Sequence, residues 1–450
     1  PLHRTSALTM SSGMPVAWRA RWRSAAARTG VDRARAITIP IDDADTAVQA
    51  MDASFRFSLE SSSVDLSAAG AVAWFRGEDA ETVGRSARVF LEAAAVEAPP
   101  EAPLPLAVGG RAFESGSAPG PWRDLDAASL VVPRIIVQRR ARAWATLWLL
   151  VGEELEAALD AADVAMTAAP VARPRYVTGV ERDPQPAFEA AVRDAVERIR
   201  AGEAAKVVLS RRTRLLGSFG GGAPIGVRLG RPDAGTARFQ IGFGERTFLG
   251  ATPELLVRRL RGTVESDALA GSAPPEEGGA LLSSTKDREE HRRVVEHVAA
   301  VARGLGASAR HPESPSLRRL GYVTHLWTPI RLEGRPDLDA WQWAEALHPT
   351  PAVGGWPPEA ALDIIRDLEP HTRGWYCGAV GWLDAAGDGE LFVALRSALV
   401  EPESAILFVG VGVGAGSDPA REWRETRWKE RAMLEAFGAS ETDAVPADSG

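Results

Sequence analysis

The sequence predicts a protein of mixed α-helices and β-strands. Two observations lead to this prediction. The N-terminal half contains short strand-like runs separated by Pro- and Gly-rich loops, and the C-terminal half alternates strands with amphipathic helices. With 450 residues, of which 45% are hydrophobic and 25% charged, the chain can bury a large core and has the composition of an ordinary globular protein.

Charge and cysteine content exclude several classes of function. With a net charge of -8, the protein is not expected to have the basic surface that binds nucleic-acid phosphates. The first 35 residues contain no apolar run long enough for a signal-peptide core or a membrane span, and the single cysteine, Cys377, excludes an intramolecular disulfide. We therefore expect a cytoplasmic protein with no nucleic-acid or membrane partner. We also expect residues 1–35 to be a disordered leader and residues 439–450 a disordered acidic tail.

Residues 36–180 are predicted to be a β-rich half that serves as scaffold. It carries no chemically informative motif. The predicted strands are Ala36–Ile41, Phe55–Leu59, Ala71–Phe75, Leu130–Gln138 and Ala143–Val151, and helical spacing occurs at Glu81–Val96 and Glu153–Met166.

The predicted catalytic region, residues 181–438, opens with a helix and the strand K-V-V-L-S at Lys206–Ser210. Apolar residues on both faces suggest a covered strand, so Lys206 is either a partly buried ammonium or an edge lysine that reaches water. A hairpin, Phe239–Phe243 and Thr247–Thr252, then leads to G-A-T-P-E, which places Glu254 just past a strand end. Such a position suits a catalytic carboxylate, but also an ordinary helix-starting residue.

Two amphipathic helices carry charges on their core-facing stripes. In the helix after the predicted cap Ser283, Glu290 lies one turn before Val294 on the apolar stripe. In the helix after the predicted cap Ser417, Glu422, Glu425 and Lys429 share one stripe. Paired carboxylates of this kind indicate a cation, and oxygen-only ligands favour Mg²⁺ over zinc; a simple salt-bridge ladder is the alternative.

Between these helices, Leu391–Val400 is predicted to be one continuous strand. Its Arg396 is expected to bind an anion, either a protein carboxylate or a ligand carboxylate. The glycine-rich run Val409–Ser417 follows. Its spacing matches neither the dinucleotide-binding nor the phosphate-loop pattern, so we reject both nucleotide readings.

Taken together, these residues resemble the chorismate-utilising enzymes, which include isochorismate, salicylate, anthranilate and aminodeoxychorismate synthases. The resemblance spans about Pro186 to Phe437 and rests on eight blocks in family order. The blocks are A-K-V-V-L-S-R at Ala205–Arg211, F-L-G-A-T-P-E-L-L at Phe248–Leu256, A-L-A-G-S at Ala268–Ser272, K-D-R-E-E-H at Lys286–His291, L-H-P-T-P-A-V-G-G at Leu347–Gly355, R-G-W-Y-C-G-A-V-G-W at Arg373–Trp382, V-A-L-R-S at Val393–Ser397 and E-W-R-E-T-R-W-K at Glu422–Lys429.

The resemblance implies a single α+β unit with a large two-sheet β core flanked by helices. It implies Mg²⁺ on Glu290 and Glu425, with Glu422 beside it, holding the ring carboxylate of chorismate. The residues it places at the substrate are Gly271, Ser272, His348, Tyr376, Arg396, Gly412 and Lys429. After Gly271, this chain lacks the Pro-Arg-Gly run usual in the family, so we expect the loop there to close differently.

Two positions favour isochorismate synthase. The family's isochorismate and salicylate synthases are similar in having a lysine where Lys206 stands, whereas anthranilate synthases have glutamine. Aminodeoxychorismate synthases carry a nucleophilic lysine where this chain has Ala270. The implied chemistry has Lys206 deprotonate a water that attacks C2 while Glu254 protonates the departing C4 hydroxyl.

The alternatives are a salicylate synthase, which also eliminates pyruvate, a synthase subunit that depends on a glutaminase, and a non-catalytic chorismate-binding relative. The full set Lys206, Glu254, Glu290 and Glu425 favours an active enzyme. We expect a monomer that needs no glutaminase subunit.

Overall fold

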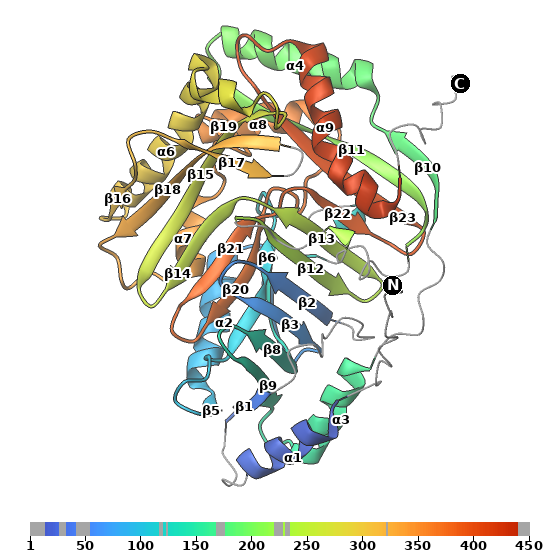
Figure 1. The fold of residues 1–450 in the computed structure, drawn as a ribbon, viewed down its shortest axis with the longest axis vertical. Coiled ribbons are helices and arrows are strands. Elements are labelled where there is room, and N and C mark those ends of the chain that lie inside the picture. Colours follow the sequence, from blue (N-terminus) through green and yellow to red (C-terminus); the bar gives the residue numbers. More distant parts are fainter. Residues whose placement is uncertain are drawn as a thin grey trace, which may run out of the picture.

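The computed structural model describes residues 14–26, 33–41, 55–116, 120–122, 125–167, 176–219, 228–229, 235–320 and 323–439. Within these ranges the chain forms two mainly antiparallel sheets with helices packed around them (Figure 1). This confirms the predicted α+β class and two-sheet core. No helix within the described ranges is both long and apolar enough to cross a membrane.

The larger sheet has 13 strands in the described part of the chain. Along the sheet they are β10 (Tyr176–Arg182), β11 (Lys206–Ser218), β23 (Ser404–Val413), β22 (Ser397–Val400), β13 (Arg246–Thr252), β12 (Ala237–Phe243), β2 (Phe55–Glu60), β3 (Asp65–Ala69), β8 (Ile135–Arg139), β9 (Ala143–Leu149), β1 (Arg35–Ile41) and β5 (Ala95–Glu97), while β19 (Gly355–Trp356) pairs with β11.

The smaller sheet has ten strands in the described part of the chain. They are β16 (Ser308–Arg310), β18 (Val323–Glu333), β15 (Thr263–Ala273), β14 (Leu255–Leu260), β21 (Gly389–Val393), β20 (Ala379–Asp384), β6 (Leu106–Arg111), β7 (Ala128–Val132) and β4 (Ala73–Gly77), with β17 (Ser316–Leu320) paired to β18. Both sheets mix strands from the two halves of the chain, since β2 pairs with β12 and β6 with β20. The β-rich half therefore completes the sheets of the second half.

The helices are α1 (Val16–Ala25), α2 (Ala80–Ala93), α3 (Leu155–Met166), α4 (Gln185–Arg200), α6 (Thr285–Gly304), α7 (Ala340–Leu347), α8 (Pro358–Leu368) and α9 (Pro419–Phe437), with short 3₁₀ turns at Gly120–Trp122 and Gly278–Leu282. Helix α9 packs on β23 and α4, and α6 packs on β15 and β18 (Figure 1). These two helices bring their charged stripes to the same region of the fold.

Three expectations need correction. Part of the expected leader is ordered, because Trp18 and Trp22 of α1 are buried in a small core shared with α3 and β1; residues 1–13, 27–32 and 440–450 lie outside the described residues. The helix caps are Ser284 and Asp418, each one residue later than predicted.

The third correction concerns Leu391–Val400, which is not one strand. The chain leaves the smaller sheet after β21 and enters the larger sheet at β22. Arg396 makes this crossing with a φ of 47°, a left-handed conformation that costs on the order of 1 kcal/mol and persists only where surrounding contacts hold it.

Candidate active site

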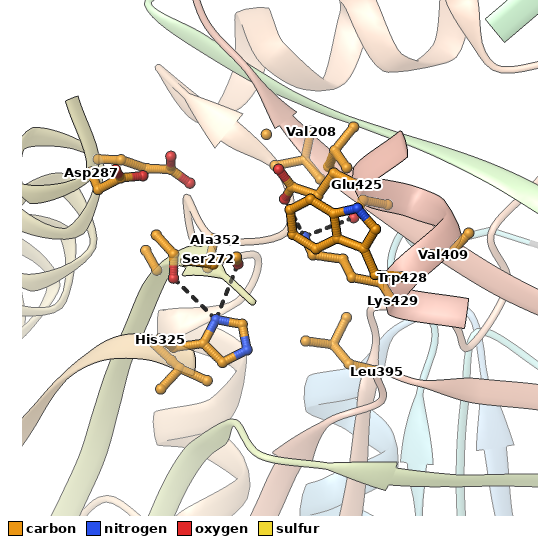
Figure 2. Close-up of a pocket in the computed structure, with 18 of the residues that line it drawn as sticks. Val208, Ser272, Asp287, His325, Ala352, Leu395, Val409, Glu425, Trp428 and Lys429 are labelled. Carbon is orange, nitrogen blue, oxygen red and sulfur yellow. Dashed lines mark hydrogen bonds and ion pairs between the residues drawn. The ribbon is translucent and has the colours of Figure 1, made fainter. Parts of the chain in front are cut away.

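A cavity of about 500 Å³ opens between α6, α9 and strands of both sheets. Ten of the residues predicted for the site line it: Glu254, Gly271, Ser272, Glu290, Tyr376, Arg396, Gly412, Glu422, Glu425 and Lys429. In Figure 2, Ser272 and His325 face Glu425, Trp428 and Lys429 across the open space. The fold thus collects residues that are up to 175 positions apart in the sequence around one chamber, from Glu254 to Lys429.

Glu254 lies between β13 and β14, as predicted, and is only 2% exposed. The Val393 amide donates to its carbonyl oxygen at 3.0 Å, which fixes the backbone to the end of β21. Burial raises the pKa of Glu254 to about 7, although the Thr350 hydroxyl, 3.3 Å from Oε1, and the Lys206 charge both lower it. A carboxyl of this kind can donate a proton near neutral pH.

Lys206 is buried at the start of β11 and is not itself among the residues that line the cavity. Its Nζ donates to Glu290 Oε1 at 2.7 Å. Burial alone would raise the pKa of Glu290, but Lys206, together with Lys429 and Lys286, holds that pKa below its usual value. Gly412 leaves room for this pair, because a Cβ there would lie 2.8 Å from Lys206 Cε.

Helix α9 contributes Glu422, Glu425 and Lys429 to the opposite wall. Lys429 Nζ lies 2.8 Å from Glu425 Oε1 and donates to the Gly410 carbonyl at 3.2 Å. Burial, and then repulsion from Glu425, raise the pKa of Glu422. The carboxylates of Glu422 and Glu425 therefore repel each other, as expected for two acids on one stripe of the helix.

The turn at Gly271 and Ser272 is tied to Arg396 through His325. Gly271 has a φ of 72°, and a Cβ there would meet Asp287 Cβ at 3.2 Å. His325 Nδ1 lies 3.1 Å from both the Gly271 carbonyl and Ser272 Oγ, while its Nε2 is 2.7 Å from Arg396 Nη2. Since Arg396 can only donate, the network assigns the hydrogen to Nδ1. Burial, together with the Arg396 charge, keeps the pKa of His325 well below its usual value, so the ring is neutral.

Sequence reasoning missed His325 and chose another histidine. His348 does not line the cavity; it ends α7, and its Nε2 bonds the Phe113 carbonyl at 3.1 Å. Of these two histidines, His325 lines the cavity and His348 does not. No local sequence signal identifies His325, because it reaches the site only through its pairing with Ser272 between β15 and β18.

Tyr376 and Cys377 close the base of the cavity. The Tyr376 ring stacks on Phe408 at 5.2 Å, and burial raises its pKa well above the usual value. Burial likewise raises the pKa of the Cys377 thiol to about 12, so the sulfur stays protonated and inert. The tyrosine can therefore act only as a neutral hydrogen-bonding group.

The three residues predicted to bind a metal have donor atoms that suit Mg²⁺. Glu290, Glu422 and Glu425 all line the cavity and offer only oxygen, which suits this cation. As positioned, Glu290 and Glu425 bond lysines, and no three acidic, histidine or cysteine side chains of the described residues already converge as a metal site. The donor atoms therefore fit Mg²⁺, but the side chains of Glu290 and Glu425 would have to change conformation to bind one ion together.

Comparisons with known proteins show the family and the fold. A family model described as "Chorismate binding enzyme" matches residues 31–438. The chain belongs to this family. A chorismate-binding relative, the isochorismate synthase MenF of Bacillus subtilis, is 33% identical over 354 residues, which are 74% of this chain and 75% of the relative. The salicylate biosynthesis isochorismate synthase of Pseudomonas aeruginosa is 44% identical over 274 residues, and this match spans only 57% of that relative's length.

Solved structures of chorismate-binding enzymes share the fold. The menaquinone-specific isochorismate synthase MenF of Escherichia coli superposes with a TM-score of 0.77 at 25% identity, covering 92% of this chain and 97% of that one. Anthranilate synthase component I of Streptococcus pneumoniae superposes with a TM-score of 0.64 at 22% identity, covering 84% and 92%. This second likeness shows the fold alone.

Proposed function

We propose that this chorismate-binding enzyme is an isochorismate synthase, an isomerase that converts chorismate to isochorismate. The observation that carries the proposal is Glu254, a buried carboxyl with a pKa of about 7. It lines the same cavity as Arg396 and Lys429, and the Lys206 charge lowers its pKa. The names of the Bacillus and Pseudomonas relatives support the same activity.

The proposed reaction exchanges one hydroxyl for another without redox chemistry. Lys206, as the neutral amine, takes a proton from water as its oxygen bonds to C2. The ring double bond shifts, and Glu254 gives its proton to the hydroxyl that leaves C4 as water. To act as the base, Lys206, whose Nζ donates to Glu290 Oε1, must first lose one ammonium proton to solvent.

The remaining residues bind and orient the substrate. Arg396 and Lys429 offer cationic donors to its carboxylates, and His325 holds Arg396 in place. A Mg²⁺ ion on Glu290, Glu422 and Glu425 would supply positive charge to the substrate carboxylate. We keep the predictions that the protein is cytoplasmic, monomeric and independent of a glutaminase.

The test is an analysis of products. The purified protein, with chorismate and Mg²⁺ at neutral pH, should form isochorismate, and the same mixture should arise from isochorismate because an isomerisation is reversible. Chromatography identifies the products, and a coupled lactate dehydrogenase assay measures pyruvate. Stoichiometric pyruvate with a fluorescent product would instead indicate a salicylate synthase. Absence of chorismate consumption would favour a partner-dependent or non-catalytic protein.

A further inference from the structure

Behind the cavity, a buried arginine joins β11 to helix α9. The Arg211 side chain is 1% exposed and lies five residues after Lys206 on the same strand. Its Nε donates to Thr426 Oγ1 at 2.7 Å, its Nη1 lies 2.9 Å from Glu430 Oε2, and its guanidinium lies 4.5 Å from the Trp423 ring centroid. None of these four residues lines the cavity.

Helix α9 carries two stripes of side chains that are one residue out of phase. The clamp stripe, which contacts Arg211, is Trp423, Thr426 and Glu430; the cavity stripe is Glu422, Glu425 and Lys429. One residue corresponds to about 100° of rotation and 1.5 Å of rise. Whatever sets the rotation of the clamp stripe therefore also sets the direction of the cavity stripe.

A buried ion pair such as Arg211–Glu430 contributes little net stability to the packing of a helix. Well-packed apolar residues in its place are often equally stable, because both charges must be removed from water. Apolar contacts, however, tolerate a rotated or shifted helix, whereas the directional bonds of a guanidinium do not. The best-attested use of such a buried polar pair is to fix register.

We propose that Arg211 is a positioning residue that fixes the rotation and axial position of α9, and so places Glu425 and Lys429 opposite Lys206 and Glu290. The proposal rests on the function proposed above, since it concerns the same site. It also assigns a role to Arg211 and Thr426, which belong to two of the sequence blocks but have no place in the chemistry.

Two substitutions test the proposal without stranding a charge. Arg211→Met leaves Glu430 bonded to Arg182 at 2.9 Å and close to Arg427 at 3.2 Å. Thr426→Val keeps the side-chain shape but removes the acceptor for Arg211 Nε. The control is Arg431→Met on the exposed side of α9, which loses an ordinary pair with Glu435.

We expect Arg211→Met to lower turnover by at least about tenfold, because small misplacements of catalytic groups can cost that much or more. Mg²⁺ affinity, measured by calorimetry, should also fall about tenfold, while far-UV dichroism and cooperative melting are retained. Thr426→Val should show the same pattern more weakly, and the double variant should lose less than the sum of the two, since both remove one interaction. Arg211→Lys should recover part of the loss.

Wild-type Mg²⁺ affinity and turnover in folded Arg211→Met and Thr426→Val would overturn the proposal and leave the proposed function intact. Losses equal to those of Arg431→Met, or proportional to the unfolded fraction, would also overturn it. If the wild-type protein converts no chorismate, the proposed function fails. The calorimetric comparison still decides the positioning role, because weaker Mg²⁺ binding by the two clamp variants than by wild type and control supports it, and equal binding refutes it.

Discussion

Replacing Glu254 with glutamine should stabilise the protein at alkaline pH while abolishing its activity. The carboxyl is 2% exposed, and burial raises its pKa from 4.5 to about 7. Glutamine has the same shape, still accepts the Thr350 hydrogen bond and cannot ionise. The variant therefore removes the charge that burial opposes and leaves the packing in place.

The size of the effect follows from the two pKa values. Below pH 4.5 the carboxyl is protonated in both the folded and unfolded states, so its contribution to stability is fully present. As pH rises through about 7, the unfolded state is ionised and the folded state is not, and stability is lost. The difference between 4.5 and 7 corresponds to roughly 3 kcal/mol.

Urea denaturation at pH 5 and pH 8 measures this effect. The difference in unfolding free energy between Glu254→Gln and wild type should shift in favour of the variant by about 2.5 kcal/mol between the two conditions, since pH 5 already lies slightly above the unfolded pKa of 4.5. Glu289→Gln on the exposed surface of α6 serves as control, because its carboxylate is half exposed and should give no comparable shift. A pH-independent difference for Glu254→Gln would refute the burial argument.

Turnover should move in the opposite direction. Loss of a general acid typically costs ~10²-fold or more, so Glu254→Gln should be nearly inactive at every pH. In the wild-type enzyme, turnover should fall about tenfold per pH unit above 7 as Glu254 loses its proton. Retained activity in the variant would remove Glu254 from the mechanism even if the stability effect is observed.

The other predictions concern the lysine, the metal carboxylates and the histidine. Lys206→Ala should still bind chorismate in a fluorescence titration but lose at least ~10²-fold in turnover, and near wild-type turnover would return Lys206 to a structural role. Glu290→Ala and Glu425→Ala should fold yet lose Mg²⁺-dependent turnover, whereas Glu289→Ala should keep it; equal wild-type rates in excess chelator would contradict the metal assignment. His325→Ala should raise the KM for chorismate by roughly 10- to 100-fold, because a bond to a charged group contributes about 1.5–3 kcal/mol, and an unchanged KM would show that Arg396 needs no such support.

Much of the site could be predicted because its signals are local. The hairpin before Glu254 and the helices that carry Glu290 and Glu425 follow from periodicity within one segment, and the structure confirms these elements. The charged stripes predict part of the site because a carboxylate on the core-facing side of a helix needs a positively charged partner. In the structure that partner is a lysine for both Glu290 and Glu425, as in the salt-bridge alternative, while the Mg²⁺ site stays a prediction.

What could not be predicted depends on contacts between distant segments. The apolar run through Leu391–Val400 reads as one strand, and only the left-handed backbone at Arg396 divides it between two sheets. In the same way, nothing within β18 marks His325 as a site residue. Its role depends on pairing with Ser272 and on the crossing that delivers Arg396, and both are properties of the assembled sheets.

The glycine-rich run beginning at Val409 shows how such contacts change the meaning of a motif. As a sequence, it suggested backbone that could approach an anion. In the structure, the run continues β23, and the register pairs Gly412 with Val208 and Gly410 with Ser210. A side chain at Gly412 would meet Lys206 Cε at 2.8 Å and Glu290 Oε1 at 3.1 Å, and one at Gly410 would lie 3.0 Å from the Tyr376 hydroxyl oxygen. The glycines therefore make space for the side chains of Lys206, Glu290 and Tyr376, a requirement that exists only once β11 and β23 lie side by side.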